Sequence, residues 1–425
     1  MKTINRRNFL KLALTSGMVI GSGGIFSACK EIAKNTDGLK NNLEIKFLRQ
    51  IITSTPKNSR CLMWQTDSPM NAPQVEIRLK NSAESIKISA VDSSFTDDGE
   101  KNLQYTAQVE NLLPNSDYEY RIFDGENSTN FFELKTPSEK NFKAIIFPDS
   151  QSADYNVWGK IAELAFKNNP DAEFFINMGD IVDNGEDKNQ WRAWMEKISE
   201  QMKKIPFAPV LGNHETYSRD WKIRFPVAYL NYFAVPENGE KNFERRFYSF
   251  DFSAAHFVVL DSQWEELEKF QPNLIETQKN WLREDFSKTS QAWRIALIHK
   301  DVLQYRINGR PERLEGFSDV GENFMPLFEE LNFDAVFTAH LHTYRNRGKL
   351  KNFVADESGV LYILTGLAGD VRYSNLWIDH ALDKVIAPQP EIDNYLTLEV
   401  DEKNFLVKCF LSDGSQLDEV HLRKD

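Results

Sequence analysis

Two different patterns of hydrophobic and polar positions divide this chain of 425 residues. Between residues 44 and 137, short segments alternate apolar and polar positions, which is typical of strands with one buried face. From residue 142 onward, short apolar runs alternate with longer segments that have the apolar spacing of amphipathic helices. The segments expected to be helices are Tyr155–Asn168, Asp187–Lys203, Leu274–Phe286 and Gly321–Leu331. The pattern predicts two domains, an all-β domain over 44–137 and an α/β domain over 141–425.

The first domain has the features of a fibronectin-like β-sandwich. Trp64 lies in the alternating segment Cys61–Thr66, where its side chain is expected to fill the core. The stretch Leu112–Arg121 is similar to the corner of such sandwiches, in which a tyrosine hydroxyl, here that of Tyr118, ties back to the backbone. Because no row of exposed aromatic residues is evident, the sequence favours a structural role over carbohydrate or partner binding.

Polar residues that can bind metal ions follow five of the apolar runs expected to be strands. Because ligands bind at the carboxyl ends of strands in α/β sheets, we expect these residues to converge on one crevice. They are Asp149 and Gln151 after 142–147, Asp180 and Asp183 after 173–178, Asn213, His214 and Glu215 after 207–211, His299 after 295–298, and His340 and His342 after 335–338. Four of the seven histidines belong to this set, which favours a metal site over chance.

In their order along the chain, these motifs resemble those of the calcineurin-like metallophosphoesterases. The set is DxQ at 149–151, GDxxD at 179–183, GNHE at 212–215, a single histidine at 299 and AHxH at 339–342. GNHE followed by HxH is specific, whereas GDxxD alone would be weak evidence. The β-sandwich ahead of them makes the chain similar to the purple acid phosphatase-like branch. The resemblance spans residues 44–425 and implies a four-layer α/β/β/α catalytic domain with two mixed sheets flanked by helices.

The resemblance also implies a centre of two metal ions. Asp180 would bridge the two ions. Asp149 and His342 would complete the coordination of one ion, and Asn213, His299 and His340 that of the other. A mixed set of oxygen and nitrogen donors favours Fe, Mn or Zn, or Co, over Ca or Mg.

Three further residues have roles implied by the resemblance. His214 would face the phosphate, where it would stabilise the transition state or protonate the leaving alkoxide. Glu215 would orient groups that surround the ligands. Asp183 takes the place where purple enzymes have a metal-binding tyrosine, so we expect no iron–tyrosinate colour, and Asp183 is expected to support ligands rather than to bind metal.

Gln151 is the main departure from the family pattern. Many members have a metal-binding histidine at this position, whereas the purple enzymes lack it and use the tyrosine. This chain has neither residue. Gln151 would bind the first metal through its side-chain oxygen, with a water molecule in that place as the alternative. A smaller departure is Ala339, which replaces the usual glycine before HxH and is tolerated if its φ stays negative.

The expected activity is hydrolysis of phosphate esters, and a phosphomonoesterase similar to the acid phosphatases is favoured. The alternative within enzymes is a phosphodiesterase that uses the same centre. The alternative outside enzymes is a surface-anchored binding protein with a vestigial metal site. Arg345, Arg372 and Tyr373 follow strands on the metal side and are expected either to contact substrate or to lie in solvated loops.

The composition and net charge indicate which kinds of molecule this protein could bind. A hydrophobic content of 41% with 12% aromatic residues suits a folded globular protein. The net charge is −12, and residues 1–28 contain four basic and no acidic side chains, so the chain without them would be near −16. Because such a chain repels polyanions, nucleic acid is not an expected partner, whereas two bound cations would attract a small phosphate ester.

The N-terminus resembles an export signal. Asn5–Lys11 contains a twin-arginine pattern, Leu12–Ile25 is a short Gly-rich apolar run, and 26–29 resembles a lipobox in which Cys29 would be lipidated. We therefore expect a signal peptide over 1–28, a polar tether over 29–43, and a location in the periplasm or at the cell surface with a lipid anchor in a membrane. The alternative is a plain signal peptide with an incidental cysteine. Cys61 and Cys409 are expected to be buried free thiols.

Overall fold

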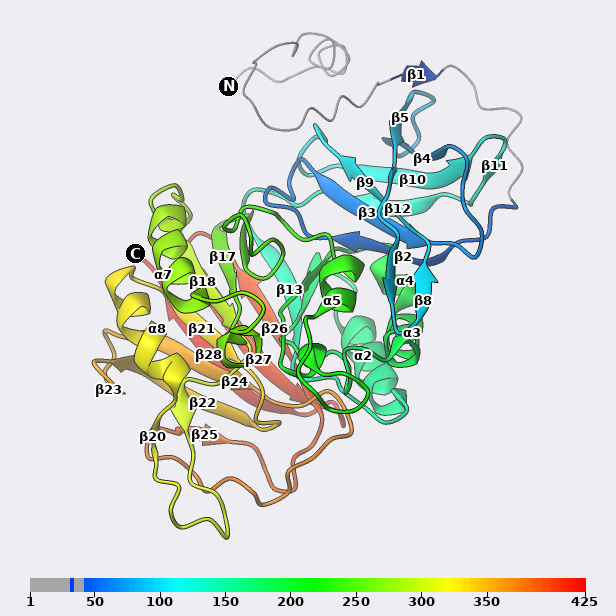
Figure 1. Ribbon diagram of the computed structural model, residues 1–425. Coiled ribbons are helices and arrows are strands. Elements are labelled where there is room, and N and C mark those ends of the chain that lie inside the picture. The colour runs from blue at the N-terminus through cyan, green and yellow to red at the C-terminus, as the bar shows by residue number, and fades with distance from the viewer. Residues whose placement is uncertain (1–30, 34–41) are drawn as a thin grey trace.

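The structure is a computed structural model that describes residues 31–33 and 42–425. The predicted signal peptide, Cys29 and most of the predicted tether lie outside the described residues. Within them, the chain forms a β-rich N-terminal part and a larger α/β part (Figure 1). The expected fold class, a β-sandwich followed by a four-layer α/β/β/α domain, is confirmed.

The N-terminal part consists of two antiparallel sheets that enclose a core. One sheet has the strand order β1-β5-β4-β10-β11, with β12 beside β10, and the other sheet has β2-β3-β9-β6 as its share of a larger sheet. The core between them contains Trp64, which is fully buried, and Tyr118. The hydroxyl of Tyr118 accepts the backbone N–H of Leu113 at 2.8 Å, so the predicted tyrosine corner is present.

The strands of this part have the following bounds. They are β1 (Glu31–Ala33), β2 (Lys46–Ile51), β3 (Arg60–Gln65), β4 (Pro73–Leu79), β5 (Ser85–Ser89), β6 (Val91–Asp92), β7 (Phe95–Asp97), β8 (Glu100–Asn102), β9 (Gln104–Val109), β10 (Asp117–Asp124), β11 (Asn127–Ser128) and β12 (Phe132–Lys135). Strands β7 and β8 pair only with each other and form a separate hairpin.

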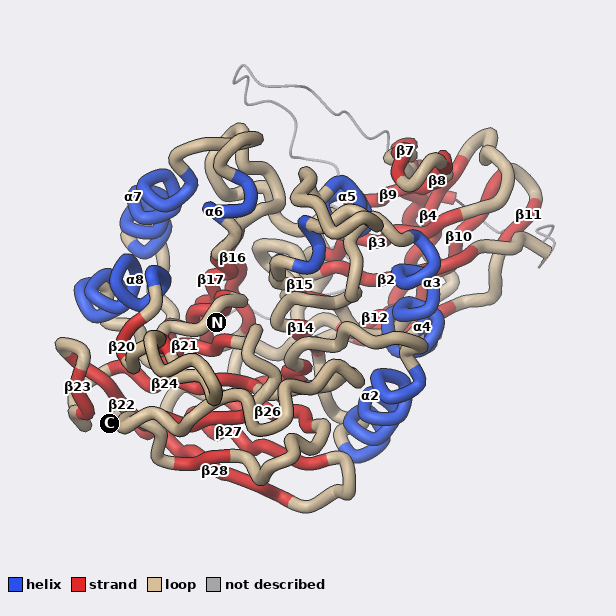
Figure 2. Tube along the Cα trace, turned by 60° about the horizontal axis from the view of Figure 1, so that its bottom comes forward, coloured by secondary structure: helices blue, strands red, loops and turns tan. Residues whose placement is uncertain are grey.

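Two stacked sheets form the centre of the α/β part. The first continues from the N-terminal part in the order β28-β27-β26-β13-β14-β15, and the second has the order β16-β17-β18-β21-β24-β22-β23, with β25 beside β22. Helices α7 and α8 lie on one side of the two sheets, and α2, α3 and α4 lie on the other side (Figure 2). This is the predicted arrangement of four layers.

The elements of the α/β part have the following bounds. The helices are α2 (Asn156–Asn168), α3 (Lys188–Lys197), α4 (Ser199–Met202), the 3₁₀ helix η1 (His214–Thr216), α5 (Val227–Tyr232), α6 (Trp264–Leu267), α7 (Leu274–Phe286) and α8 (Asp319–Glu330). The strands are β13 (Phe142–Phe147), β14 (Phe174–Asn177), β15 (Phe207–Pro209), β16 (Tyr248–Phe252), β17 (Ala255–Leu260), β18 (Trp293–Ile298), β19 (Leu303–Gln304), β20 (Gly316–Phe317), β21 (Ala335–Thr338), β22 (Tyr344–Lys351), β23 (Val354–Ala355), β24 (Val360–Thr365), β25 (Val385–Ile386), β26 (Asn394–Val400), β27 (Asn404–Leu411) and β28 (Gln416–Arg423).

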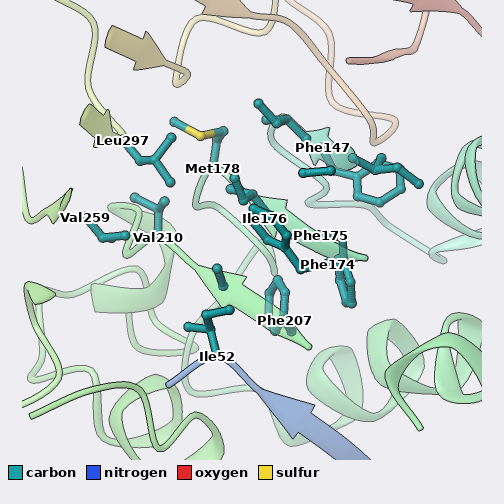
Figure 3. Close-up of a cluster of buried hydrophobic side chains, with 14 of the residues drawn as sticks. Ile52, Phe147, Phe174, Phe175, Ile176, Met178, Phe207, Val210, Val259 and Leu297 are labelled. Atoms are coloured by element: carbon teal, nitrogen blue, oxygen red, sulfur yellow. The ribbon is translucent and has the colours of Figure 1, made fainter. Parts of the chain in front are cut away.

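Aromatic side chains on alternate positions of β14 hold the layers together. The ring of Phe174 packs against Phe252 of the second sheet, with ring centroids 4.3 Å apart, whereas Phe175 packs against Phe166 of α2 on the opposite face at 5.5 Å. Successive strand residues point to opposite faces of a sheet, so a short, wholly apolar strand is buried on both sides. Figure 3 shows Phe174 and Phe175 in this buried cluster, together with Phe207 of β15 and Ile52 just after β2.

The two parts of the molecule share one sheet. Strand β2 pairs in parallel with β15 through Ile51 and Phe207, and the N–H of Ile52 donates to the carbonyl oxygen of Phe207 at 3.0 Å. The sandwich is therefore not a separate body joined only by a linker. The predicted domain boundaries stay a prediction.

The prediction of one helix over Asp187–Lys203 is wrong. Two helices, α3 and α4, occupy this segment and meet at Ile198, where the backbone leaves the helical region with φ of −121°. Ile198 is fully buried, so the break places its side chain in the core. None of the helices in the described residues has the length and apolar character needed to cross a membrane. Both Cys61 and Cys409 are free and buried, as expected.

Candidate metal centre

The predicted metal-binding residues occupy the carboxyl ends of strands in both sheets. The first sheet supplies oxygen donors, with Asp149 after β13, Asp180 after β14 and Asn213 after β15. The second sheet supplies imidazoles, with His299 directly after β18 and both His340 and His342 after β21. All six are buried except His340, which is half-buried. The facing ends of the two sheets therefore bring carboxylate and imidazole groups together away from water.

Asp180 is common to two clusters of potential ligands. In one cluster, the ligand atoms of Asp180, His299 and His340 all lie within 4.8 Å of one another, and in the other the same holds for Asp149, Asp180 and His342. Oδ2 of Asp180 lies 3.2 Å from Nε2 of His299, and Oδ2 of Asp149 lies 3.3 Å from Nε2 of His342. The predicted division into two ligand groups that share Asp180 matches this geometry, while metal ligation itself stays a prediction.

Asn213 joins the first cluster through its side-chain oxygen. Its Oδ1 lies 3.1 Å from Nε2 of His299. The backbone N–H of His340 donates to both oxygens of Asp149 at 3.0 and 3.2 Å. This contact joins a residue of the first cluster to a residue of the second.

Backbone carbonyls orient two of the imidazoles. Nδ1 of His299 lies 2.9 Å from the carbonyl oxygen of Met178, and Nδ1 of His342 lies 2.6 Å from that of Val371. With the proton on Nδ1 donated to a carbonyl, Nε2 is left with a lone pair that points into the site, which is the usual arrangement of metal-binding histidines.

The ligand-bearing turns depend on backbone conformations that are uncommon for residues with side chains. Asp180, His340 and His342 have φ of 47°, 79° and 51°. Such left-handed conformations cost free energy and cluster at functional sites, where the surrounding structure enforces them. Ala339 is absent from the described residues with positive φ, so the alanine before HxH is accommodated as expected.

Glycines allow the turns to approach each other closely. A Cβ atom on Gly212 would lie 2.2 Å from both the backbone nitrogen and Oδ1 of Asp180, and one on Gly179 would lie 2.6 Å from Nδ1 of His299. Any side chain at these two positions would displace a predicted ligand, which explains why glycine precedes Asp180 and Asn213.

Glu215 binds the backbone of the turn that carries Asp180. Its Oε2 accepts the N–H groups of Asp180 and Gly212 at 3.0 and 2.8 Å, and its Oε1 accepts those of Ile181 and Val182 at 2.8 and 3.3 Å. Glu215 thus holds both glycine-containing turns in one position.

The pKa values of Asp180, His299 and His340 are shifted from their usual ranges. Burial opposes the ionisation of Asp180, but the nearby imidazoles of His299 and His214 outweigh it and hold the pKa of Asp180 well below its usual range. Burial opposes protonation of His299, but Asp180 outweighs this effect and raises the pKa of His299 to about 9. Burial and the proximity of His299 lower the pKa of His340. The site therefore keeps a charged carboxylate in a low-dielectric interior, where the neighbouring imidazoles stabilise its charge.

His214 lies beside the two clusters. Its backbone N–H donates to Oδ1 of Asp180 at 2.8 Å, and its Nδ1 lies 2.7 Å from the carbonyl oxygen of Asp183. The carboxylate of Asp183 lies 3.6 Å from the same Nδ1. These contacts place Nε2 of His214 toward the site, 4.0 Å from Oδ2 of Asp180. Asp183 positions His214, and it belongs to neither ligand cluster within the described residues.

Gln151 is fully buried and lies next to His214. Its amide nitrogen lies 3.4 Å from Oδ1 of Asp183 and 3.4 Å from Nε2 of His214. Its oxygen, Oε1, has no hydrogen-bond partner among the described residues, and the same is true of Nδ1 of His340. Buried polar atoms without partners are rare because they lose their hydration. Two such atoms beside a buried carboxylate are free to act as donors to a cation, so the residues present fit a metal centre.

Comparison with known proteins identifies the domains. Residues 143–344 match the family described as calcineurin-like phosphoesterase, and residues 47–143 match the purple acid phosphatase N-terminal domain. The chain carries a calcineurin-like phosphoesterase domain behind a purple acid phosphatase N-terminal domain. The family resemblance seen in the motifs is therefore confirmed.

Curated relatives that match this chain include plant purple acid phosphatases. Purple acid phosphatase 23 of Arabidopsis thaliana is 28% identical over 186 residues, which are 43% of this chain and 38% of that protein. Purple acid phosphatase 1 of Ipomoea batatas is 23% identical over 286 residues, which are 62% and 58% of the two chains. The matched part of the chain thus spans less than two thirds of the length of either relative.

Solved structures share the fold. Purple acid phosphatase PPD1 from yellow lupin (Lupinus luteus) seeds has a TM-score of 0.75 at 17% identity and covers 90% of this chain and 74% of its own. The structure of PhoD has a TM-score of 0.61 at 12% identity, and the match covers 87% of this chain and 91% of the PhoD chain. At these identities the similarity shows a shared fold.

Aromatic residues of the phosphoesterase domain that the motifs did not indicate surround His214 and His342. Tyr217 and Trp221 lie beside His214, with ring centroids 5.5 and 5.9 Å away, and Tyr373 stacks on His342 at 4.7 Å. The sequence left open whether Tyr373 contacts substrate or lies in a solvated loop, and the structure places it beside His342. For Tyr217 and Trp221, the only signal in the sequence is that they follow the GNHE motif closely.

The two arginines considered as substrate contacts are engaged elsewhere. Arg345 is buried and forms ion pairs with Asp379 and Asp383, and Arg372 pairs with Asp393. A cavity of about 1110 Å³ lies away from the strand ends, between the sandwich and helices α3 and α4, and no predicted site residue lines it. The chemistry of the donor groups, rather than cavity size, locates the candidate site.

Proposed function

We propose that this protein is an exported, metal-dependent phosphoesterase that hydrolyses phosphate monoesters. The observation that carries the proposal is that Asp180 belongs to both ligand clusters, because a single shared carboxylate is what a pair of adjacent metal ions requires. The phosphoesterase and purple acid phosphatase N-terminal matches support the reaction class. Phosphate-ester small molecules are the proposed substrates.

The residues would divide between two metal ions. Asp149, His342 and Asp180, with Gln151 at one further position, would hold one ion, and Asp180, Asn213, His299 and His340 would hold the other. When bound, the two ions would clamp the phosphoryl oxygens and lower the pKa of a water molecule so that it attacks near neutral pH. The mixture of oxygen and nitrogen donors supports Fe, Mn or Zn.

His214 would act on the leaving group. Because its Nδ1 contacts the carbonyl oxygen of Asp183, its Nε2 is the atom that faces the site. In this position Nε2 would donate a hydrogen bond to the phosphoryl or leaving oxygen and would deliver a proton to the departing alkoxide. Glu215 and Asp183 would keep the ligand turn and the imidazole in place during this step.

A direct test combines metal analysis with turnover. The protein, reconstituted separately with Fe, Mn and Zn, is assayed on a phosphate monoester and on a diester with the same alcohol, and Asp180→Asn is measured in parallel. We expect about two metal ions per chain and a higher kcat/KM for the monoester. Asp180→Asn should lose more than the roughly 100-fold that changes around a metal site typically cost.

Each alternative has its own outcome in this test. A higher kcat/KM for the diester would assign the site to a phosphodiesterase. Fewer than one metal ion per chain after reconstitution, together with no turnover on either ester, would favour a binding protein with a vestigial site. Near-wild-type hydrolysis by Asp180→Asn would refute the bridging role of this residue.

The location outside the cytoplasm is a proposal from residues 1–29 alone. We expect Cys29→Ser to move the protein from the membrane fraction to the soluble exported fraction, because a lipid chain on Cys29 would supply the anchor. Replacing Arg6 and Arg7 by lysine should block export through the twin-arginine route. A protein that stays with the membrane after Cys29→Ser would contradict lipidation at this residue.

A further inference from the structure

The loop that follows His214 presents an exposed tryptophan next to this histidine. Tyr217 and Ile223 pair as an isolated antiparallel bridge, and the N–H of Trp221 donates to the carbonyl oxygen of Ser218 at 2.8 Å within the turn between them. Trp221 is 58% exposed, an unusual state for so large an apolar side chain. Its position beside the candidate site distinguishes it from a scattered surface residue.

The backbone of Trp221 is held in an unfavourable conformation. Its φ is +59°, a left-handed value that costs free energy for any residue with a Cβ atom. Such conformations persist where the surrounding structure enforces them, and they concentrate at ligand-binding positions. A loop that served only to connect two segments would be more stable with glycine or asparagine at this position.

The hairpin β7–β8 of the N-terminal sandwich fixes this loop from outside. Arg224 forms a two-pronged ion pair with Asp97, and Arg219 pairs with Asp98 at 3.2 Å. The backbone N–H of Arg219 also donates to Glu186 at 2.8 Å. The loop is thus tied on both sides of Trp221, so the indole is presented without a large entropic cost on binding.

The rings form a surface beside the imidazole of His214. The centroid of Tyr217 lies 5.5 Å from that of His214 with an interplanar angle of 82°, and the centroid of Trp221 lies at 5.9 Å with an angle of 89°. The two rings are 6.1 Å apart. If His214 protonates the leaving oxygen, the rest of the leaving group extends past the imidazole to these two rings.

We infer that Tyr217 and Trp221 form a subsite for a flat aromatic part of the leaving group of a phosphate monoester, such as the base of a nucleotide or the ring of a short aryl-alkyl ester. This inference rests on the proposed phosphoesterase function and adds the substrate class. Aromatic faces bind flat rings through stacking, which is tolerant of the identity of the base. An aliphatic leaving group would gain much less from these two rings.

The test compares pairs of esters that share the same type of alcohol and differ only in the flat ring. One pair is adenosine 5′-monophosphate and ribose 5-phosphate, and the other is benzyl phosphate and cyclohexylmethyl phosphate. For wild type we expect the ratio of kcat/KM within at least one pair to favour the aromatic ester by roughly 5- to 150-fold, the range that stacking of one base provides. Selectivity in the first pair alone would indicate nucleotides, and in the second pair alone short aryl-alkyl esters.

Three variants separate recognition from support of His214. Trp221→Ala should bring the ratio close to one, Trp221→Phe should restore part of it, and Ile223→Ala, which alters an exposed apolar side chain of the same loop, should leave it at the wild-type value. A ratio near one for both pairs in wild type would overturn the inference. An equal loss on both members of each pair in Trp221→Ala would also overturn it, because the indole would then only support the imidazole.

Equilibrium binding makes the inference testable apart from turnover. Calorimetric titration of the metal-loaded protein with adenosine 5′-monophosphate, ribose 5-phosphate, and the benzyl and cyclohexylmethyl esters gives the same comparison. Absence of phosphate release from all four esters would count against the proposed function. A preference for an aromatic ester that disappears in Trp221→Ala would still establish the subsite, and equal affinities within both pairs would reject it.

Discussion

The carboxylate of Asp97 in the N-terminal sandwich forms a two-pronged ion pair with the guanidinium group of Arg224 in the phosphoesterase domain. One of the two contacts joins Nη1 of Arg224 to Oδ2 of Asp97 at 3.0 Å, and both side chains are largely buried. Arg224 follows the loop that carries Trp221, so the sandwich contributes to the position of residues beside His214. Together with the pairing of β2 and β15, this contact joins the two domains directly.

Asp97→Ala should lower the free energy of unfolding by about 2 kcal/mol, because the buried guanidinium of Arg224 would lose a charged hydrogen-bond partner. Urea unfolding measures this change, and a double-mutant cycle with Arg224→Ala isolates the pair. The matched control is Lys46→Ala, whose ion pair with Asp67 is exposed and should contribute less than about 1 kcal/mol. Equal losses in Asp97→Ala and Lys46→Ala would show that the contact between the domains adds no stability.

Glu215→Gln should weaken metal binding by about 10- to 100-fold, since Glu215 orients the turn of Asp180 rather than binding metal itself. An amide offers one acceptor oxygen where the carboxylate offers two, so some of the four backbone N–H groups would lose their acceptor. We expect a loss of about 3 kcal/mol in the free energy of unfolding for this reason. Metal titration and urea unfolding measure the two effects. Glu163→Gln, on the exposed side of α2, is the control and should change neither.

Gln151→His should raise the affinity of the first metal position, because an imidazole nitrogen is a stronger donor than an amide oxygen. Gln151→Leu removes the donor and keeps an uncharged side chain of related size. If Gln151 is a ligand, metal affinity measured by chelator competition should follow the order His, Gln, Leu. Equal affinities for wild type and Gln151→Leu would mean that water takes this coordination position.

His256 should make stability depend on pH. It lies between Asp251 and Asp285, with its ring nitrogens 2.7 and 2.8 Å from their oxygens. Burial opposes protonation of His256, but these hydrogen bonds outweigh it and raise its pKa. The imidazolium therefore stabilises the folded state fully below the unfolded pKa of about 6.5, and this contribution is lost as the pH rises through the folded pKa.

His256→Gln should accordingly cost more stability in acid than in base. We expect the difference from wild type in urea unfolding to be larger by about 1 kcal/mol at pH 6 than at pH 9. His421→Gln, which changes an exposed histidine, should show no such dependence. A difference that grows toward high pH would contradict a raised pKa for His256.

The predicted ligands could be read from the sequence because each follows a short apolar run. Such runs are buried strands, and the carboxyl ends of parallel strands meet at one edge of a sheet. Asp149, Asp180 and His299 were found in this way. The tyrosine corner at Tyr118 was found from local residue types, because it depends on a contact with Leu113 only a few residues away.

Other features could not be predicted from local pattern. Strand β28 was missed because Gln416–Arg423 is an edge strand in which every residue is half-buried or exposed. The break at Ile198 depends on the core that receives its side chain, and amphipathic spacing continues through it. Trp221 could not be recognised as a site residue, since its position depends on a left-handed turn and on ion pairs to a hairpin of the other domain.

The amino-acid sequence alone predicted the fold class, the order of the two domains and the polar residues that meet at the strand ends, because these depend on periodic burial and on motifs that follow apolar runs. Only the tertiary structure decided which aromatic rings border His214 and that one sheet runs through both domains. These relationships rest on contacts between segments far apart in the chain, which no local pattern encodes. Examples are the pairing of β2 with β15 and the ion pairs from the β7–β8 hairpin to the loop that carries Trp221.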